Sequence, residues 1–267
     1  MTPRTILVHV TPEGLKNGRV DAALELARHF DASLIGAGAM ARPEVIVTPE
    51  GLMHPDPANI TMLENDLKAL SLRFTKRVAS LGKGKTSWRS ALAAPAPFIA
   101  EQARAADLLV LSSRADKDFP VIGVDPSDVI MAAGRPVITI PRGKTGMDLS
   151  TIVIAWKDTP QARRATASAL PVLAGARKVV IAGVGEEAPG KALDDVASWL
   201  ASHAIKAETL HVKGKNAGKE ILKTAENLDA GLIVAGAYGR SRLREFILGG
   251  VTRDLLFKSG TPCLFCH

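Results

Sequence analysis

Apolar residues recur along this chain in two different patterns. Short, nearly continuous apolar runs are typical of strands that are buried on both faces of a sheet. They occupy residues 5–10, 33–39, 86–92, 107–112, 136–141, 151–156, 178–183, 208–212, 231–235 and 261–267. Segments with apolar residues at every third or fourth position predict amphipathic helices between these strands. They occupy residues 19–30, 61–81, 97–105, 125–133, 161–174, 196–203, 220–228 and 253–258.

The order of these elements occurs twice. The run at 151–156 matches the run at 5–10, and the last two runs of the second half match 107–111 and 135–141. An internal duplication accounts for this repetition. We therefore expect an α/β fold of two tandem Rossmann-like domains, residues 1–146 and 147–267, each a five-stranded parallel sheet with helices on both faces. The first half is longer because residues 42–59, with four prolines, predict a loop excursion.

The amino-acid composition limits the classes of ligand and partner that we expect this chain to bind. The 267 residues are 46% hydrophobic, so the chain can build sizeable cores, and the formal net charge of +7 permits anionic partners such as nucleotides. Aromatic residues make up only 4% of the chain and the basic residues are spread out, which makes nucleic acid an unfavoured partner. No apolar run reaches 18 residues, so we expect no membrane span. A strand within the first ten residues leaves no room for a signal peptide, and we expect the cytoplasm.

The two cysteines and the histidines do not predict a metal or haem site. Cys263 and Cys266 stand three positions apart on a predicted strand and should point to opposite faces, which disfavours haem attachment and zinc binding. His9 lies inside the first strand and is expected to be a core residue.

The most informative stretch runs from Gly236 to Thr252 and reads as strand, glycine-bearing loop and helix. Glycines allow close backbone approach, a helix N-terminus suits phosphate, and Arg240, Arg242 and Arg244 add positive charge. The glycines alone are equally compatible with a turn whose only role is to let a helix pack against a strand. In open α/β sheets, however, ligands bind beyond the carboxyl ends of the strands. That rule selects the residues after the first and fourth strands of the second half, namely Trp156, Lys157, Asp158 and Gly236 to Gly239.

The spacing Gly236-x2-Gly239-x9-Gly249-x-Val251 is similar to the nucleotide motif of the universal stress protein family, and both halves resemble a tandem member. The resemblance implies the adenine nucleotide alpha hydrolase-like variant of the fold and ATP as ligand, with Mg²⁺ accompanying it. It implies a phosphate side formed by Gly236, Gly239, Gly249, Gly250 and Val251, and an adenine side lined by Ala155 and Val184. Arg240, Ser241 and Thr252 complete the implied site.

The chain departs from that family's pattern at several positions. Gly250 stands where a Ser or Thr is usual, and Lys157 stands where the first strand commonly ends in Asp. Asp158 is one position later and, on an extended strand, would face the opposite way. In the first half Ser112 replaces the first glycine and only Gly123 survives of the later ones, so we expect a degenerate loop there.

The resemblance predicts a stress-response protein with an adenine nucleotide site in its second half. No general base is evident, so we expect no enzyme activity beyond slow ATP hydrolysis at most. Two alternatives stay open: a nucleotide-independent scaffold that recruits protein partners, and a slow ATPase. We expect the two halves to pack as an intramolecular pseudo-dimer, and a homodimer is compatible with this arrangement.

Overall fold

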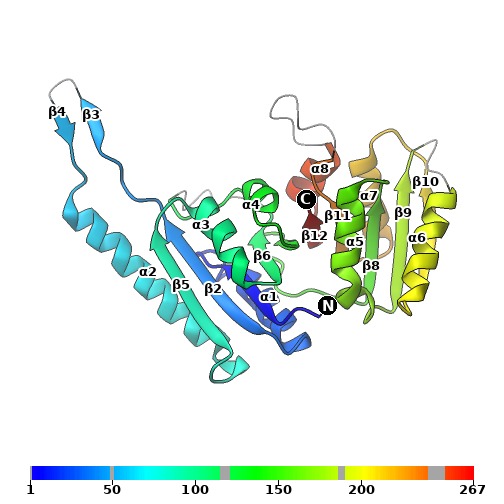
Figure 1. Ribbon diagram of the computed structural model, residues 1–267, viewed down its shortest axis with the longest axis horizontal. Coiled ribbons are helices and arrows are strands. Elements are labelled where there is room, and N and C mark those ends of the chain that lie inside the picture. Colours follow the sequence, from blue (N-terminus) through cyan, green and yellow to red (C-terminus); the bar gives the residue numbers. More distant parts are fainter. Residues whose placement is uncertain (1, 49–50, 115–120, 186–189, 240–249) are drawn as a thin grey trace.

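A computed structural model describes residues 2–48, 51–114, 121–185, 190–239 and 250–267 (Figure 1). The first half contains β1 (Thr5–His9), α1 (Arg19–His29), β2 (Ser33–Met40), β3 (Ile46–Thr48), β4 (Gly51–Met53), α2 (Pro57–Val78), β5 (Thr86–Leu92), α3 (Pro95–Gln102), β6 (Leu108–Ser112), α4 (Pro126–Ala132) and β7 (Val137–Ile140). The second half contains β8 (Thr151–Trp156), α5 (Pro160–Leu173), β9 (Lys178–Val184), α6 (Gly190–Ser202), β10 (Ala207–Val212), α7 (Ala217–Asn227), β11 (Leu232–Gly236), α8 (Gly250–Lys258) and β12 (Cys263–Cys266).

Ten strands form one sheet in the order β10-β9-β8-β11-β12-β7-β6-β1-β2-β5. Within each half the five strands of this sheet are parallel. Counted within a half, their order across the sheet is 3-2-1-4-5, that is β5-β2-β1-β6-β7 in the first half and β10-β9-β8-β11-β12 in the second. This order is doubly wound. The halves meet where β12 pairs antiparallel with β7, with Leu264 opposite Ile138. The predicted α/β fold is confirmed, and the strands of both halves form one continuous sheet. The domain division after residue 146 stays a prediction.

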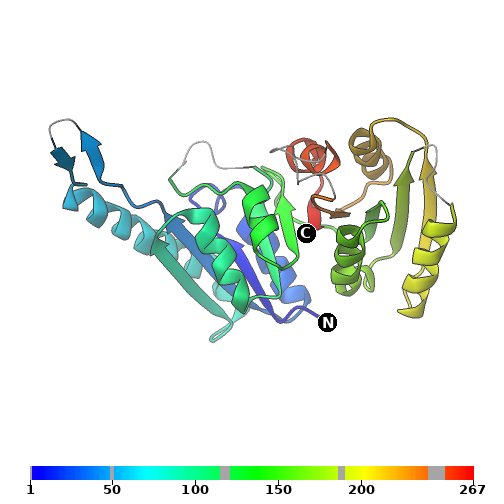
Figure 2. The same cartoon turned by 45° about the horizontal axis from the view of Figure 1, so that its top comes forward.

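Helices cover both faces of this sheet, as Figure 1 and Figure 2 show from two directions. One core lies under α1, α2, α5 and α6, and the other lies under α3, α4, α7 and α8. Successive strand residues alternate between the two cores, with Ile6 and Val8 on one side and Leu7 on the other. Because both faces are buried, the strands read in sequence as continuous apolar runs.

The cysteines behave as expected from this alternation. Cys266 lies in the first core and Cys263 in the second, and both thiols are free. Burial raises the pKa of the Cys263 thiol to about 12. His9 is likewise buried, as predicted for a core residue.

Three sequence predictions were wrong in detail. The excursion at 42–59 contains an antiparallel hairpin, β3–β4, and the first residues of α2. Asp56 caps that helix by accepting a hydrogen bond from the Ala58 backbone N–H, and Pro57 is tolerated in its first turn. Helix α6 begins at Gly190 rather than residue 196, and α3 ends at Gln102 before a short 3₁₀ turn, Ala103–Ala105.

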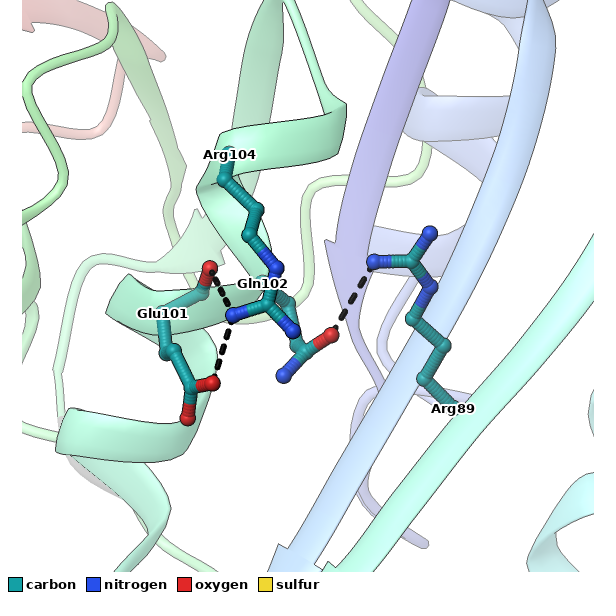
Figure 3. A network of polar contacts seen from close by, with 4 residues as sticks. All are labelled: Arg89, Glu101, Gln102 and Arg104. Carbon is teal, nitrogen blue, oxygen red and sulfur yellow. Dashed lines mark hydrogen bonds and ion pairs between the residues drawn. The ribbon is translucent and has the colours of Figure 1, made fainter.

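The terminal strand β5 is tied to α3 by polar contacts. Arg89 on β5 donates to the Gln102 side chain with an Nη1–Oε1 distance of 3.0 Å, and Arg104 forms an ion pair with Glu101 beside it (Figure 3). These contacts lie on one face of β5, while Trp88 and Leu92 face α2. None of the helices in the described ranges combines the length and apolar content that crossing a bilayer requires.

Candidate functional site

A cavity of about 710 Å³ opens at the carboxyl ends of β8, β9 and β10. Its floor follows from strand register, because Trp156 lies opposite Gly183, and Gly183 lies opposite His211. The lining residues are Ala155, Trp156, Lys157, Asp158, Gly183, Val184, Gly185, Ala192, Leu193, Gly214, Lys215, Ala217, Ile221 and Val251. Six residues predicted from the sequence therefore meet in one place: Ala155, Trp156, Lys157, Asp158, Val184 and Val251.

Lys157 and Asp158 both reach this cavity, contrary to the expectation that they face opposite ways. The reason is that β8 ends at Trp156, so neither residue belongs to an extended strand. The chain turns there into α5, whose first N–H groups are capped by Thr159: the Ala162 N–H donates to Thr159 Oγ1 over 3.2 Å. Departure from the strand places two adjacent side chains on one rim.

The inner part of the cavity is apolar. Ala155, Trp156, Val184, Leu193, Ile221 and Val251 contribute this surface. The side chain of His211 contacts the Gly185 carbonyl oxygen at 2.8 Å and so fixes the loop after β9 that forms one wall. A slot of this kind suits a flat, largely apolar ring, since ligand pockets combine apolar walls with a few placed polar groups.

The rim of the cavity is electropositive. Lys157 and Lys215 line it, and neither forms an ion pair with another described residue. Asp158 is the only acidic side chain among the described lining residues, and its carboxylate is bound by Arg163, with an Nη2–Oδ1 distance of 2.6 Å. Helix α7 begins beside Lys215, and Val251 belongs to the first turn of α8. Two helix N-termini, each carrying partial positive charge, thus lie at the same cavity.

The glycines of the predicted loop have separate roles. A Cβ atom on Gly236 would lie 2.5 Å from the backbone nitrogen of Ala162, so this glycine is required for α5 to pack on β11. A Cβ atom on Gly239 would find Thr159 Cγ2 at 3.7 Å, an ordinary contact, and a Cβ atom on Gly250 would find no atom of the described residues within 4 Å. The described residues therefore leave space beside Gly239 and Gly250.

Thr252 is buried and faces the protein. Its hydroxyl accepts a hydrogen bond from the Tyr238 backbone N–H, with an N–Oγ1 distance of 3.4 Å. Thr252 therefore holds the start of the loop and is placed to position it. Arg240, Ser241 and Gly249 lie outside the described residues, as do Arg242 and Arg244.

Several lining residues were not predicted. Gly185, Gly214, Lys215 and Ala217 follow the second and third strands of the second half, and Leu193 and Ile221 come from α6 and α7. The rule that ligands bind at the carboxyl ends of strands would have found the first four if it had been applied to every strand. The two helix residues carry no such signal.

The equivalent strand end in the first half is filled by its own side chains. Thr11 accepts hydrogen bonds from the Arg19 side chain at 2.8 Å and from the Gly14 N–H at 2.9 Å. His9 Nε2 lies 3.1 Å from the Ile122 carbonyl oxygen. Burial, together with the nearby Arg19 charge, holds the pKa of His9 well below its usual value. Arg19, the first residue of α1, is itself buried at this position.

No group of three or more His, Cys, Asp or Glu side chains is placed to hold a metal ion within the described ranges. The Mg²⁺ expected to accompany ATP stays a prediction.

Comparison with known proteins shows a similarity to one family. Residues 157–267 match the model of the universal stress protein family. A universal stress protein of Methanocaldococcus jannaschii is 33% identical over 79 residues, which cover 30% of this chain and 48% of that protein, so the match spans about half the length of this curated relative.

Two solved structures extend the comparison. A universal stress protein from Archaeoglobus fulgidus superposes with a TM-score of 0.78 at 15% identity, covering 98% of this chain and 97% of its own, which shows that the whole chain shares that fold. A universal stress protein in complex with cAMP matches 52% of this chain and 98% of its own at 19% identity, with a TM-score of 0.38.

Proposed function

We propose that the second half of the chain, in which residues 157–267 match the model of the universal stress protein family, binds an adenine nucleotide, with ATP as the first candidate. Membership of that family supports a role in stress response. In this proposal the bound nucleotide is part of how the protein performs that role.

One observation carries the proposal. The residues that follow the first two strands of the second half meet Val251 of α8 in a single cavity with an apolar interior and a cationic rim. An adenine ring matches the apolar slot beside Ala155 and Val184. Phosphates match the helix start at Gly250 and Val251, where backbone N–H groups have no partner inside the helix. Gly239 leaves the space that such an approach needs.

The two lysines bear on which nucleotide is preferred. Lys157 and Lys215 follow β8 and β10, which are two strand spacings apart, roughly 10 Å. Positive charge therefore borders the cavity at more than one point, and the single carboxylate on the described rim is already engaged by Arg163. This arrangement favours di- and triphosphates over an uncharged nucleoside.

The same arrangement favours binding over catalysis. General-base catalysis needs a proton acceptor within reach of the attacking water. Among the described lining residues, Asp158 is the one carboxylate, and it is held by Arg163. We therefore expect ATP to stay intact or to turn over slowly in the purified protein.

The test begins with the purified full chain. Mass spectrometry of small molecules released on denaturation, followed by calorimetric titration with ATP, should reveal a bound or bindable adenine nucleotide. Gly239→Val places a branched side chain in the open space and should weaken ATP binding by roughly a hundredfold.

Gly260→Val is the matched control, because a Cβ atom there likewise meets no described atom closer than an ordinary van der Waals contact, and Gly260 does not line the cavity. Equal ATP affinity in Gly239→Val and Gly260→Val would refute the assignment of this site. A protein that is empty and fails to titrate would favour the scaffold, and steady turnover with Mg²⁺ would favour the ATPase.

A further inference from the structure

Exposed apolar side chains gather at one end of the first half. Val45, Val47, Leu52 and Met53 are 46%, 78%, 63% and 59% exposed, and they lie on or beside the β3–β4 hairpin, here called the arm. On α2, Met62 is 56% and Leu72 is 73% exposed. These are six of the nine large apolar residues that are exposed among the described ones. Exposed apolar side chains that gather in one part of a molecule often mark an interaction site.

The arm receives little support from its own molecule. It forms a separate two-stranded sheet and projects from the body near the start of α2 (Figures 1 and 2). The first ten residues of that helix, 57–66, include no buried residue. A two-stranded hairpin is marginally stable in water by itself. The arm therefore needs another surface to become well ordered.

A groove that suits the arm lies between α2 and the terminal strand β5. It has a volume of about 640 Å³ and is lined by Glu64, Leu67, Lys68, Ser71, Leu72, Trp88, Ser90, Ala91 and Leu92. Strand β5 is the last strand of the ten-stranded sheet, so its outer edge is open to another strand. Figure 1 shows the arm extending from the start of α2 away from β5.

We propose that the arm of one molecule packs into the α2–β5 groove of a second copy of this chain, and that a two-fold axis makes the exchange reciprocal. Every copy carries both an arm and a groove. In a two-fold symmetric dimer each arm would therefore lie in the groove of the other molecule, and both apolar surfaces would be buried in both molecules.

The charged residues near the arm and in the groove are compatible with a second copy of this chain in the groove. Arg42 and Glu44 directly precede the arm, Glu64 and Lys68 line the groove, and none of these four forms an ion pair within the described part of the chain. Each surface thus offers one charge of each sign to the other. Pairing of arm residues with the open edge of β5 would add backbone hydrogen bonds. The dimer would form at the end of the molecule remote from the nucleotide cavity.

The first experiment is sedimentation equilibrium of the full chain over a concentration series. The wild type should dimerise. Val47→Asp in the arm and Leu72→Asp in the groove should each raise the dimer dissociation constant by roughly a hundredfold, because each buries a carboxylate in an apolar contact. Both positions are exposed within one molecule, so circular dichroism should show unchanged folding. Leu210→Asp, at a position that is 38% exposed on β10, is the control and should dimerise like the wild type.

Mixing the two variants tests reciprocity. A heterodimer of Val47→Asp with Leu72→Asp keeps one intact arm and its intact groove, so the mixture should dimerise at concentrations where each variant alone is monomeric. A monomeric wild type, a dimer insensitive to either variant, or a mixture no better than its components would overturn the proposal. ATP titration of the same variants should match the wild type, which separates this result from the fate of the nucleotide site.

Discussion

Substitution of Gly236 by alanine distinguishes the two roles that glycines can have in the predicted loop. The added Cβ atom would lie 2.5 Å from Ala162 N and 2.7 Å from the Gln161 carbonyl carbon, both of them backbone atoms. A flexible side chain could rotate away, but the backbone at the start of α5 can only move as a unit. Helix α5 packs on β8, β11 and β12, so its displacement would disturb the centre of the second half.

The expected cost follows from that overlap. Overpacking of a well-packed interior usually costs about 1–3 kcal/mol, and the rigidity of this contact places Gly236→Ala near the upper end. For a domain of this size, that corresponds to a fall in Tm of roughly 4–10 °C. Gly239→Ala is the comparison, because its Cβ atom would make only a 3.7 Å contact with Thr159. It should leave Tm within about 1 °C of the wild type.

Differential scanning calorimetry and ATP titration of both variants make the measurement. We expect Gly236→Ala to lose stability while the folded fraction still binds ATP within about threefold of the wild type. Gly239→Ala should keep its stability. A Gly236→Ala protein as stable as the wild type would show that α5 moves freely. Equal destabilisation by both substitutions would show that the two glycines do not differ.

Two further predictions concern charge. Folded His9 has a pKa below that of the unfolded chain, so its neutral burial contributes stability above the unfolded pKa of about 6.5 that is lost as pH falls below it. Unfolding by urea should therefore show lower stability at pH 5 than at pH 7.5, and His9→Gln should flatten this dependence; an unchanged slope would refute the role of His9. Lys215→Gln should weaken ATP binding by roughly tenfold by calorimetry, and Lys213→Gln, an exposed neighbour that does not line the cavity, should not. Equal effects of the two lysine substitutions would show that only overall charge matters.

Much of the fold was predictable because burial on both faces leaves a simple signal. Continuous apolar runs located all ten strands of the main sheet, and repetition of their order gave the two halves. The β3–β4 hairpin gave no such signal, because Val47, Leu52 and Met53 are exposed and prolines interrupt the segment. The antiparallel pairing of β7 with β12 was not predicted from the sequence either. Pairing between the two halves depends on which strand lies at the open edge of each half, and the periodicity of apolar residues along the chain does not show this.

The site was predictable only to the extent that topology determined it. Residues at strand ends, such as Ala155 and Val184, follow from a parallel sheet, and they do line the cavity. The role of Gly236 could not be predicted, because it depends on where α5 crosses β11. Arg19 was missed for a similar reason. The hydrogen bond between Arg19 and Thr11 joins α1 to the chain just after β1. No rule of sequence spacing predicts that a side chain of the first half will occupy the place where a ligand of that half would bind.

The joint between β7 and β12 has a consequence for either half on its own. Val137 and Phe265 are fully buried where the two strands meet, so either half in isolation would present a sticky apolar edge and tend to aggregate. The first half therefore acts as a cover for this edge of the second half, and the second half covers the first in the same way.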